Sequence, residues 1–202
     1  TGRAASLFAS AEEALLAIHP QDARQYGLQE GQLVHVESRR GAALYRLQYD
    51  DSLQRGLLFV PMHFGSRYSP AALCNSVTLA AIDPYSGEPE FKHTAVRISA
   101  AELPWEAAAL VEDDTRDLSA ILRQLAQGFP YASITPLVSK HGAAVLLRVA
   151  AEQAPESELA QRWDTALALS GADTLLYEDP RQGVSKRLRI RGGRLTGLRL
   201  WG

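Results

Sequence analysis

The first hundred residues carry short strand-like segments separated by tight turns, and this spacing constrains the fold more than any other feature of the chain. Residues 32–38 and 42–50 alternate side chains as half-buried strands do. Residues 56–64 form a continuous apolar run, which predicts a strand covered on both faces. Residues 75–82 and 94–98 complete a set of five or six short strands. Because closure removes exposed edges, such a set favours a closed β-barrel.

One helix is predicted within this β-rich part. Pro20 suits a first helical position, Asp22 lies in the first turn, and Gly27 stands where a left-handed cap belongs. The single cysteine, Cys74, is predicted to be a small buried apolar residue, because free cysteine is among the most buried residue types.

The composition changes near residue 100, where acidic residues gather around Pro104. We take this as a domain boundary, with the acidic run placed ahead of a helix that its charge would stabilise. Helices are predicted over 115–128 and 155–171, strands over 131–139, 142–152 and 173–179, and a hairpin over 185–200 that turns at Gly192-Gly193. The predicted fold is therefore mainly β, with a barrel domain over residues 1–100 and a smaller α+β domain over residues 101–202.

Charge and motifs exclude several classes of function. The net charge of −2 and the pI near 6.2 give no global basic field to gather nucleic acid. No apolar run approaches the ~20 residues that span a bilayer. A lone cysteine cannot form a disulfide within the chain, and the five histidines lack metal-binding spacing. The sequence also lacks the glycine-rich nucleotide loops and any recognisable nucleophile or acid–base pair. We therefore predict no catalytic residue, no metal site, no nucleic-acid partner and no membrane partner.

Residues at the ends of predicted strands support binding better than catalysis. His63 follows the apolar run, where loops build sites, although a polar residue there also caps a barrel rim. Asn75 offers a donor and an acceptor to the edge of a heterocycle, or forms a turn ahead of a strand. Phe91 could stack on a flat ligand or plug the barrel mouth. Lys92 could meet a phosphate or simply be solvated.

The predicted hairpin near the C-terminus places three arginines on one strand face. Arg187, Arg189 and Arg191 alternate with Leu188 and Ile190. Two interpretations are open, a solvated face and a surface that docks to an acidic partner domain.

Three segments together resemble the C-terminal molybdopterin-dinucleotide-binding domain of prokaryotic molybdenum oxidoreductases. They are "HPQDARQYGLQEGQLVHVESRRG" at residues 19–41, "GLLFVPMHFG" at residues 56–65 and "NSVTLAAIDPYSGEPEFKHTAVRI" at residues 75–98. The resemblance covers about residues 1–98 and is closest to the catalytic subunit of assimilatory nitrate reductases. It implies a double-psi β-barrel that closes over a molybdenum bis(molybdopterin guanine dinucleotide) cofactor. The cofactor contacts that it implies are Thr1, Gly2, Arg3, His63, Asn75, Phe91 and Lys92.

The resemblance also implies a role for the longer protein from which we expect this chain to be cut. That parent would reduce nitrate to nitrite in the cytoplasm, with the metal ligand and a [4Fe-4S] cluster upstream of this fragment. The fragment would be inactive alone, and its partners would be the upstream domains of the same polypeptide; no segment of the chain indicates the electron donor. The alternatives are the equivalent domain of a formate dehydrogenase and a non-catalytic double-psi barrel used for docking.

A second resemblance concerns the C-terminal end. Residues 170–202 resemble the small C-terminal module of flavin-dependent nitrite and rubredoxin reductases. This places the end of the chain in an α+β module separate from the barrel.

Overall fold

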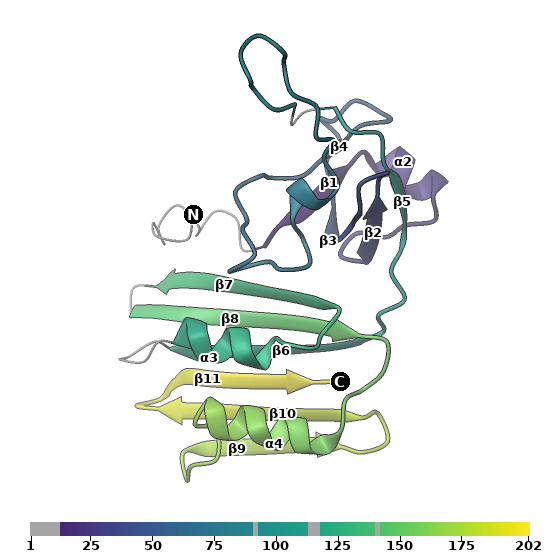
Figure 1. The fold of residues 1–202 in the computed structure, drawn as a ribbon. Coiled ribbons are helices and arrows are strands. Elements are labelled where there is room, and N and C mark those ends of the chain that lie inside the picture. Colours follow the sequence, from purple (N-terminus) through teal and green to yellow (C-terminus); the bar gives the residue numbers. More distant parts are fainter. Residues whose placement is uncertain (1–12, 91–92, 113–117, 140–141) are drawn as a thin grey trace. The chain divides into compact units, whose positions relative to one another are not determined.

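The computed structural model of the chain describes residues 13–90, 93–112, 118–139 and 142–202 (Figure 1). The chain divides into two compact units. One runs from Ala14 to Glu102 and is called the barrel unit below; the other runs from Leu103 to Gly202, includes Glu13, and is called the sheet unit.

The barrel unit is built on a five-stranded sheet in the order β4-β1-β3-β2-β5, which curls into a half-barrel (Figure 1). Its strands are β1 Leu15–Ile18, β2 Leu33–Glu37, β3 Ala42–Tyr49, β4 Leu58–Phe59 and β5 Arg97–Ala100. β1 pairs with β3 in parallel, and the other pairings are antiparallel. The prediction of a mainly β fold is confirmed, while the double-psi connection stays a prediction.

The predicted helix forms as α2, Pro20–Gln25, with the predicted signals at both ends. His19 is the N-cap, and its Nδ1 accepts a hydrogen bond from the amide of Gln21 at 3.1 Å. Gly27 adopts a left-handed φ of 68°, which ends the helix without a side-chain clash.

The predicted strand over residues 56–64 is wrong for most of its length. Only Leu58–Phe59 pairs, and only with β1, so this is an edge strand rather than one covered on both faces. Leu57, Phe59 and Met62 are exposed accordingly. Pro61 explains the short pairing, since proline has no amide to continue a ladder.

The predicted strand over residues 75–82 is also wrong. A 3₁₀ turn, η1 at Cys74–Ser76, stands at its start, and Ser76 Oγ donates to the carbonyls of Leu73 (2.6 Å) and Ala42 (3.1 Å). A Cβ on Gly41 would lie 2.8 Å from the Ser76 carbonyl oxygen, so the β2–β3 turn approaches η1 closely. Side-chain bonds and a close backbone contact thus favour a turn where alternation alone suggested a strand.

The sheet unit contains a six-stranded antiparallel sheet in the order β7-β8-β6-β11-β10-β9 (Figure 1). Its elements are β6 Trp105–Glu112, α3 Leu118–Leu125, β7 Tyr131–Ser139, β8 Gly142–Ala151, α4 Ser157–Ala166, β9 Thr174–Asp179, β10 Val184–Arg191 and β11 Arg194–Trp201. Both helices lie on one side of the sheet, called the helix face below. The opposite side is called the open face.

Aromatic side chains fill the core under the two helices. Trp105 stacks on Phe129 with ring centroids 5.9 Å apart, and Trp163 of α4 meets Trp201 edge-on at 5.4 Å. Strand β6 was not predicted, because Glu106 and Glu112 were assigned to an acidic run at a domain boundary, ahead of a helix. The alternate residues Trp105, Ala107, Ala109 and Val111 are all buried, which is the pattern of a strand.

The expectation that the hairpin arginines face solvent or a partner domain is wrong for Arg187 and Arg189. Arg189 is buried and donates to the carbonyl of Leu167 (3.1 Å) at the end of α4 and to the carbonyl of Thr196 (2.9 Å). Arg187 Nε lies 2.9 Å from Asp164 Oδ2, although its N–H does not have hydrogen-bond geometry. These arginines attach helix α4 to the sheet.

A buried ion pair completes this attachment. Arg199, 2% exposed, donates to both carboxylate oxygens of Asp164 at 2.6 and 3.2 Å, and to Ser185 Oγ at 3.2 Å. The pair joins α4 to β11 across the helix face.

Glu13 belongs to the sheet unit although it precedes the barrel unit in sequence. Tyr131 donates its hydroxyl hydrogen to Glu13 Oε1, and Arg148 Nη1 lies 2.9 Å from Glu13 Oε2. The barrel unit is therefore inserted between two parts of the sheet unit.

Candidate functional site

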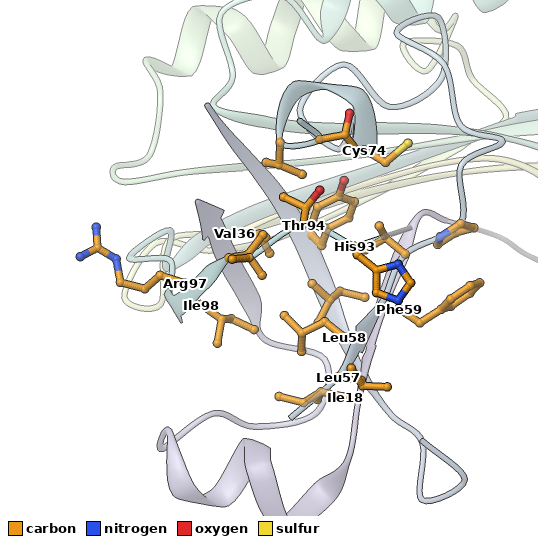
Figure 2. A pocket seen from close by; sticks show the side chains of 18 of the residues that line it. Ile18, Val36, Leu57, Leu58, Phe59, Cys74, His93, Thr94, Arg97 and Ile98 are labelled. Carbon is orange, nitrogen blue, oxygen red and sulfur yellow. The ribbon is translucent and has the colours of Figure 1, made fainter. Parts of the chain in front are cut away.

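A cavity of about 950 Å³ lies within the barrel unit. Apolar side chains form much of its wall, including Leu16, Ile18, Val36, Val77 and Ile98. Polar groups from several chain segments also line it: His63, Asn75, Thr78, His93 and Thr94. Figure 2 shows side chains of the sheet and of the surrounding segments converging on this space.

Asp22 fixes the wall that contains residues 56–63. Its carboxylate accepts from Arg55 Nε at 3.0 Å and from the Gly56 amide at 2.6 Å. These bonds, the Gly56 amide first and Arg55 second, hold the pKa of Asp22 below its usual range. Helix α2 thus anchors the segment that leads to His63.

A second wall is formed by residues 93–98, which lead into β5. His93 and Phe59 both line the cavity, whereas Figure 2 shows that the guanidinium of Arg97 points away from it. Arg97 Nη2 lies 2.5 Å from Glu37 Oε2. That partner holds the pKa of Glu37 below its usual range, so Arg97 is occupied by an ion pair.

The third wall combines η1 with strand β3. Cys74 is half-buried, rather than fully buried as predicted, and its Sγ lies 3.4 Å from Asn75 Oδ1. Burial raises the pKa of the Cys74 thiol. Tyr45 is fully buried, its hydroxyl has no hydrogen-bond partner among the described residues, and burial raises its pKa as well.

Two of the predicted site residues, His63 and Asn75, line this one cavity. The other five, Thr1, Gly2, Arg3, Phe91 and Lys92, lie outside the described residues. Sequence reasoning missed His93 and Thr94, which directly follow Phe91-Lys92, and Cys74, which directly precedes Asn75. The signal available in the sequence was that these residues are adjacent to residues already predicted to contact the cofactor.

The cavity's chemistry suits binding. Its polar residues supply an amide, two hydroxyls and two imidazoles beside an apolar wall, as a flat heterocycle with a polar edge requires. Across the part of the chain that the structure describes, no cluster of three or more His, Cys, Asp or Glu could hold a metal ion. The donor set therefore fits an organic heterocycle.

The described helices also bear on membrane association. None of them is long and apolar enough to cross a membrane.

Comparison with known proteins identifies a family and similar proteins. Residues 1–95 match the family described as "Molydopterin dinucleotide binding domain". A nitrate reductase of Klebsiella oxytoca is 35% identical over 137 residues, which is 66% of this chain and 16% of that protein. Among solved structures, the acetylene hydratase of Pelobacter acetylenicus aligns with a TM-score of 0.43 and 18% identity over 50% of this chain and 16% of that chain.

Proposed function

Residues 1–95 belong to the molybdopterin dinucleotide-binding domain family, and from this premise we propose that the chain holds the dinucleotide cofactor of a molybdenum nitrate reductase. The supporting observation is that His63 and Asn75, both within the matched residues, line one cavity whose donors suit a heterocycle. The identity to a nitrate reductase supports nitrate as the substrate of the whole protein.

Asn75 is the group we assign to the edge of the heterocycle. Its exposed amide both donates and accepts, and it lies in the wall where η1 fixes the backbone. The imidazoles of His63 and His93 are exposed and also line the cavity. These groups would bind and orient the cofactor.

The charged parts of the dinucleotide need cations. Arg55 and Arg97 are each paired with a carboxylate of the barrel unit, so neither is assigned to the pyrophosphate. We assign that contact to Lys92, and contacts with the pterin-facing side to Thr1, Gly2, Arg3 and Phe91. These assignments rest on the family resemblance, because the five residues lie outside the described part of the chain.

The bound molybdenum cofactor, as bis(molybdopterin guanine dinucleotide), would supply the oxygen-atom transfer that converts nitrate to nitrite. The chain spans 16% of the length of the nitrate reductase that it matches. In the whole protein, the metal ligand and a [4Fe-4S] cluster would come from upstream domains of the same polypeptide, which we place in the cytoplasm. This chain alone would not catalyse the reaction.

The test uses the whole nitrate reductase that carries this chain. We expect Asn75→Ala to lower the content of molybdenum and of guanine nucleotide released by acid hydrolysis. Gln48→Ala is the matched control, because Gln48 is an exposed amide that does not line the cavity. A parent protein without molybdenum or guanine nucleotide would refute the family role, and full loading of the Asn75 variant would refute its assignment. Activity with formate rather than nitrate would refute the substrate.

A further inference from the structure

One tyrosine on the cavity-lining face of the barrel unit's sheet has a hydroxyl without a partner among the described residues. Tyr45 lies in the central strand β3, opposite Val34 of β2, and is fully buried. A second tyrosine of β3 on the same face, Tyr49, donates its hydroxyl hydrogen to the Leu28 carbonyl at 3.1 Å. The side chains that line the cavity from this face are otherwise apolar: Leu16, Ile18, Val36 and Ile98.

A buried hydroxyl without a partner destabilises the empty chain, because it has lost its hydrogen bonds to water and gained none in return. Phenylalanine at position 45 would keep the contacts of the ring and remove this penalty. Burial, and to a smaller degree Cys74, raises the pKa of Tyr45, so the hydroxyl keeps its proton. The Tyr45 hydroxyl is therefore a hydrogen-bond donor that no described group uses.

Two hydrogen bonds hold strand β3 against the segment that carries Asn75. The amide of Leu44 donates to the carbonyl of Ala71 at 2.8 Å, and Ser76 Oγ donates to a carbonyl at the start of β3 at 3.1 Å. One bond lies before η1 and the other at its end, so β3 and η1 form one wall. Tyr45 and Asn75 both line the cavity from this wall.

We propose that the Tyr45 hydroxyl donates a hydrogen bond to a ring nitrogen or carbonyl oxygen of the heterocycle that binds in this cavity, beside the edge that Asn75 binds. This inference rests on the proposed cofactor role and adds a contact from the sheet itself. A ligand with an acceptor at this point satisfies the hydroxyl, whereas an apolar ligand of the same shape leaves it unpaired. Tyr45 therefore also selects for a polar ring.

The hydroxyl is covered in the empty chain, so a side chain of the same wall moves when the ligand reaches it. Cys74 is near the hydroxyl, since its charge contributes to the raised pKa of Tyr45. Its thiol is half-buried and donates to Asn75 Oδ1 over 3.4 Å, and a thiol is a weak donor. A heterocycle with a stronger N–H donor replaces the thiol at Asn75 and gains access to Tyr45.

The test uses the whole nitrate reductase that carries this chain, loaded with cofactor. Tyr45→Phe removes the hydroxyl and keeps the ring. After gel filtration into cofactor-free buffer, the molybdenum and the guanine nucleotide that stay bound to the protein are measured over time. We expect the variant to lose both roughly twofold to tenfold faster than the unchanged protein, as expected for the loss of one hydrogen bond.

Tyr49→Phe is the matched control, because Tyr49 lies on the same strand but does not line the cavity. It should lose the cofactor as slowly as the unchanged protein. In the 202-residue chain without cofactor, Tyr45→Phe should raise the urea midpoint and Tyr49→Phe should lower it. A purely structural role of the Tyr45 hydroxyl would instead lower both stability and cofactor retention.

The outcomes separate this contact from the cofactor role as a whole. Equal retention by the Tyr45 variant and the unchanged protein, or a less stable Tyr45 variant of the empty chain, would overturn the assignment of Tyr45 and leave the cofactor role standing. An unchanged parent protein that carries neither molybdenum nor guanine nucleotide would overturn both.

Discussion

Replacing Asp164 with asparagine should destabilise the sheet unit strongly. Its carboxylate accepts two bonds from Arg199 at 2.6 and 3.2 Å, and the two side chains are 6% and 2% exposed. Asparagine keeps the volume but leaves the guanidinium buried without its counter-charge. Breaking a buried pair in this way costs about 3–5 kcal/mol of the free energy of unfolding.

The structure provides a selective assay for this change. The three tryptophans, Trp105, Trp163 and Trp201, all belong to the sheet unit and cluster in its core. Urea unfolding followed by tryptophan fluorescence therefore reports the sheet unit without the barrel unit. The midpoint should fall with little change in slope if the folded state keeps its compactness.

Two further variants separate the charge effect from a general loss of contacts. Asp164→Leu combined with Arg199→Met should recover part of the lost stability, since apolar replacement of a buried pair is often neutral, while Arg187 still loses its carboxylate partner. Glu37→Gln breaks the exposed pair with Arg97 and should change stability little. A loss below about 1 kcal/mol for Asp164→Asn would refute the view that burial makes this pair important.

Two other predictions concern the barrel unit. The pKa of Asp22 is lowered in the folded state, so its stabilising contribution is present above the unfolded pKa and is lost as pH falls through the folded pKa. Asp22→Asn should therefore lower the free energy of unfolding at pH 7 and make it depend less on pH in the acid range. Urea unfolding followed by circular dichroism at several pH values checks this. A free energy of unfolding that falls with pH as steeply as in the unchanged chain would contradict this prediction. Tyr45→Phe removes a buried hydroxyl without a partner and should raise the free energy of unfolding by about 1 kcal/mol. Tyr49→Phe removes a hydroxyl that donates to the Leu28 carbonyl at 3.1 Å and should lower the free energy of unfolding. A loss of stability in both tyrosine variants would contradict the prediction for Tyr45.

Elements with local signals could be predicted from the sequence. The cap at His19, the proline at the first position of α2 and the left-handed glycines at 192 and 193 act within a few residues, and those elements form where expected. Strand β6 was missed, because its pairing partners, β8 and β11, lie far from it in sequence. Its two glutamates were assigned to the acidic run at the domain boundary instead.

The candidate site shows the same limit. His63 and Asn75 could be selected because one follows and the other opens a predicted strand and both match the family resemblance; both line the cavity. The hairpin arginines were misread, because the groups that bind them on α4, Asp164 and Leu167, lie about two dozen residues away. Alternation identifies which side chains share a face, but not what covers that face.

The position of β11 in the sheet has a consequence for synthesis of the chain. This strand comes last in the sequence among the described elements, yet it lies between β6 and β10. Until it leaves the ribosome, the strands already made form two separate groups, β7-β8-β6 and β10-β9, each with an unpaired inner edge. Emergence of β11 is then the event that joins them, and a chain stalled before this strand would expose both edges to aggregation.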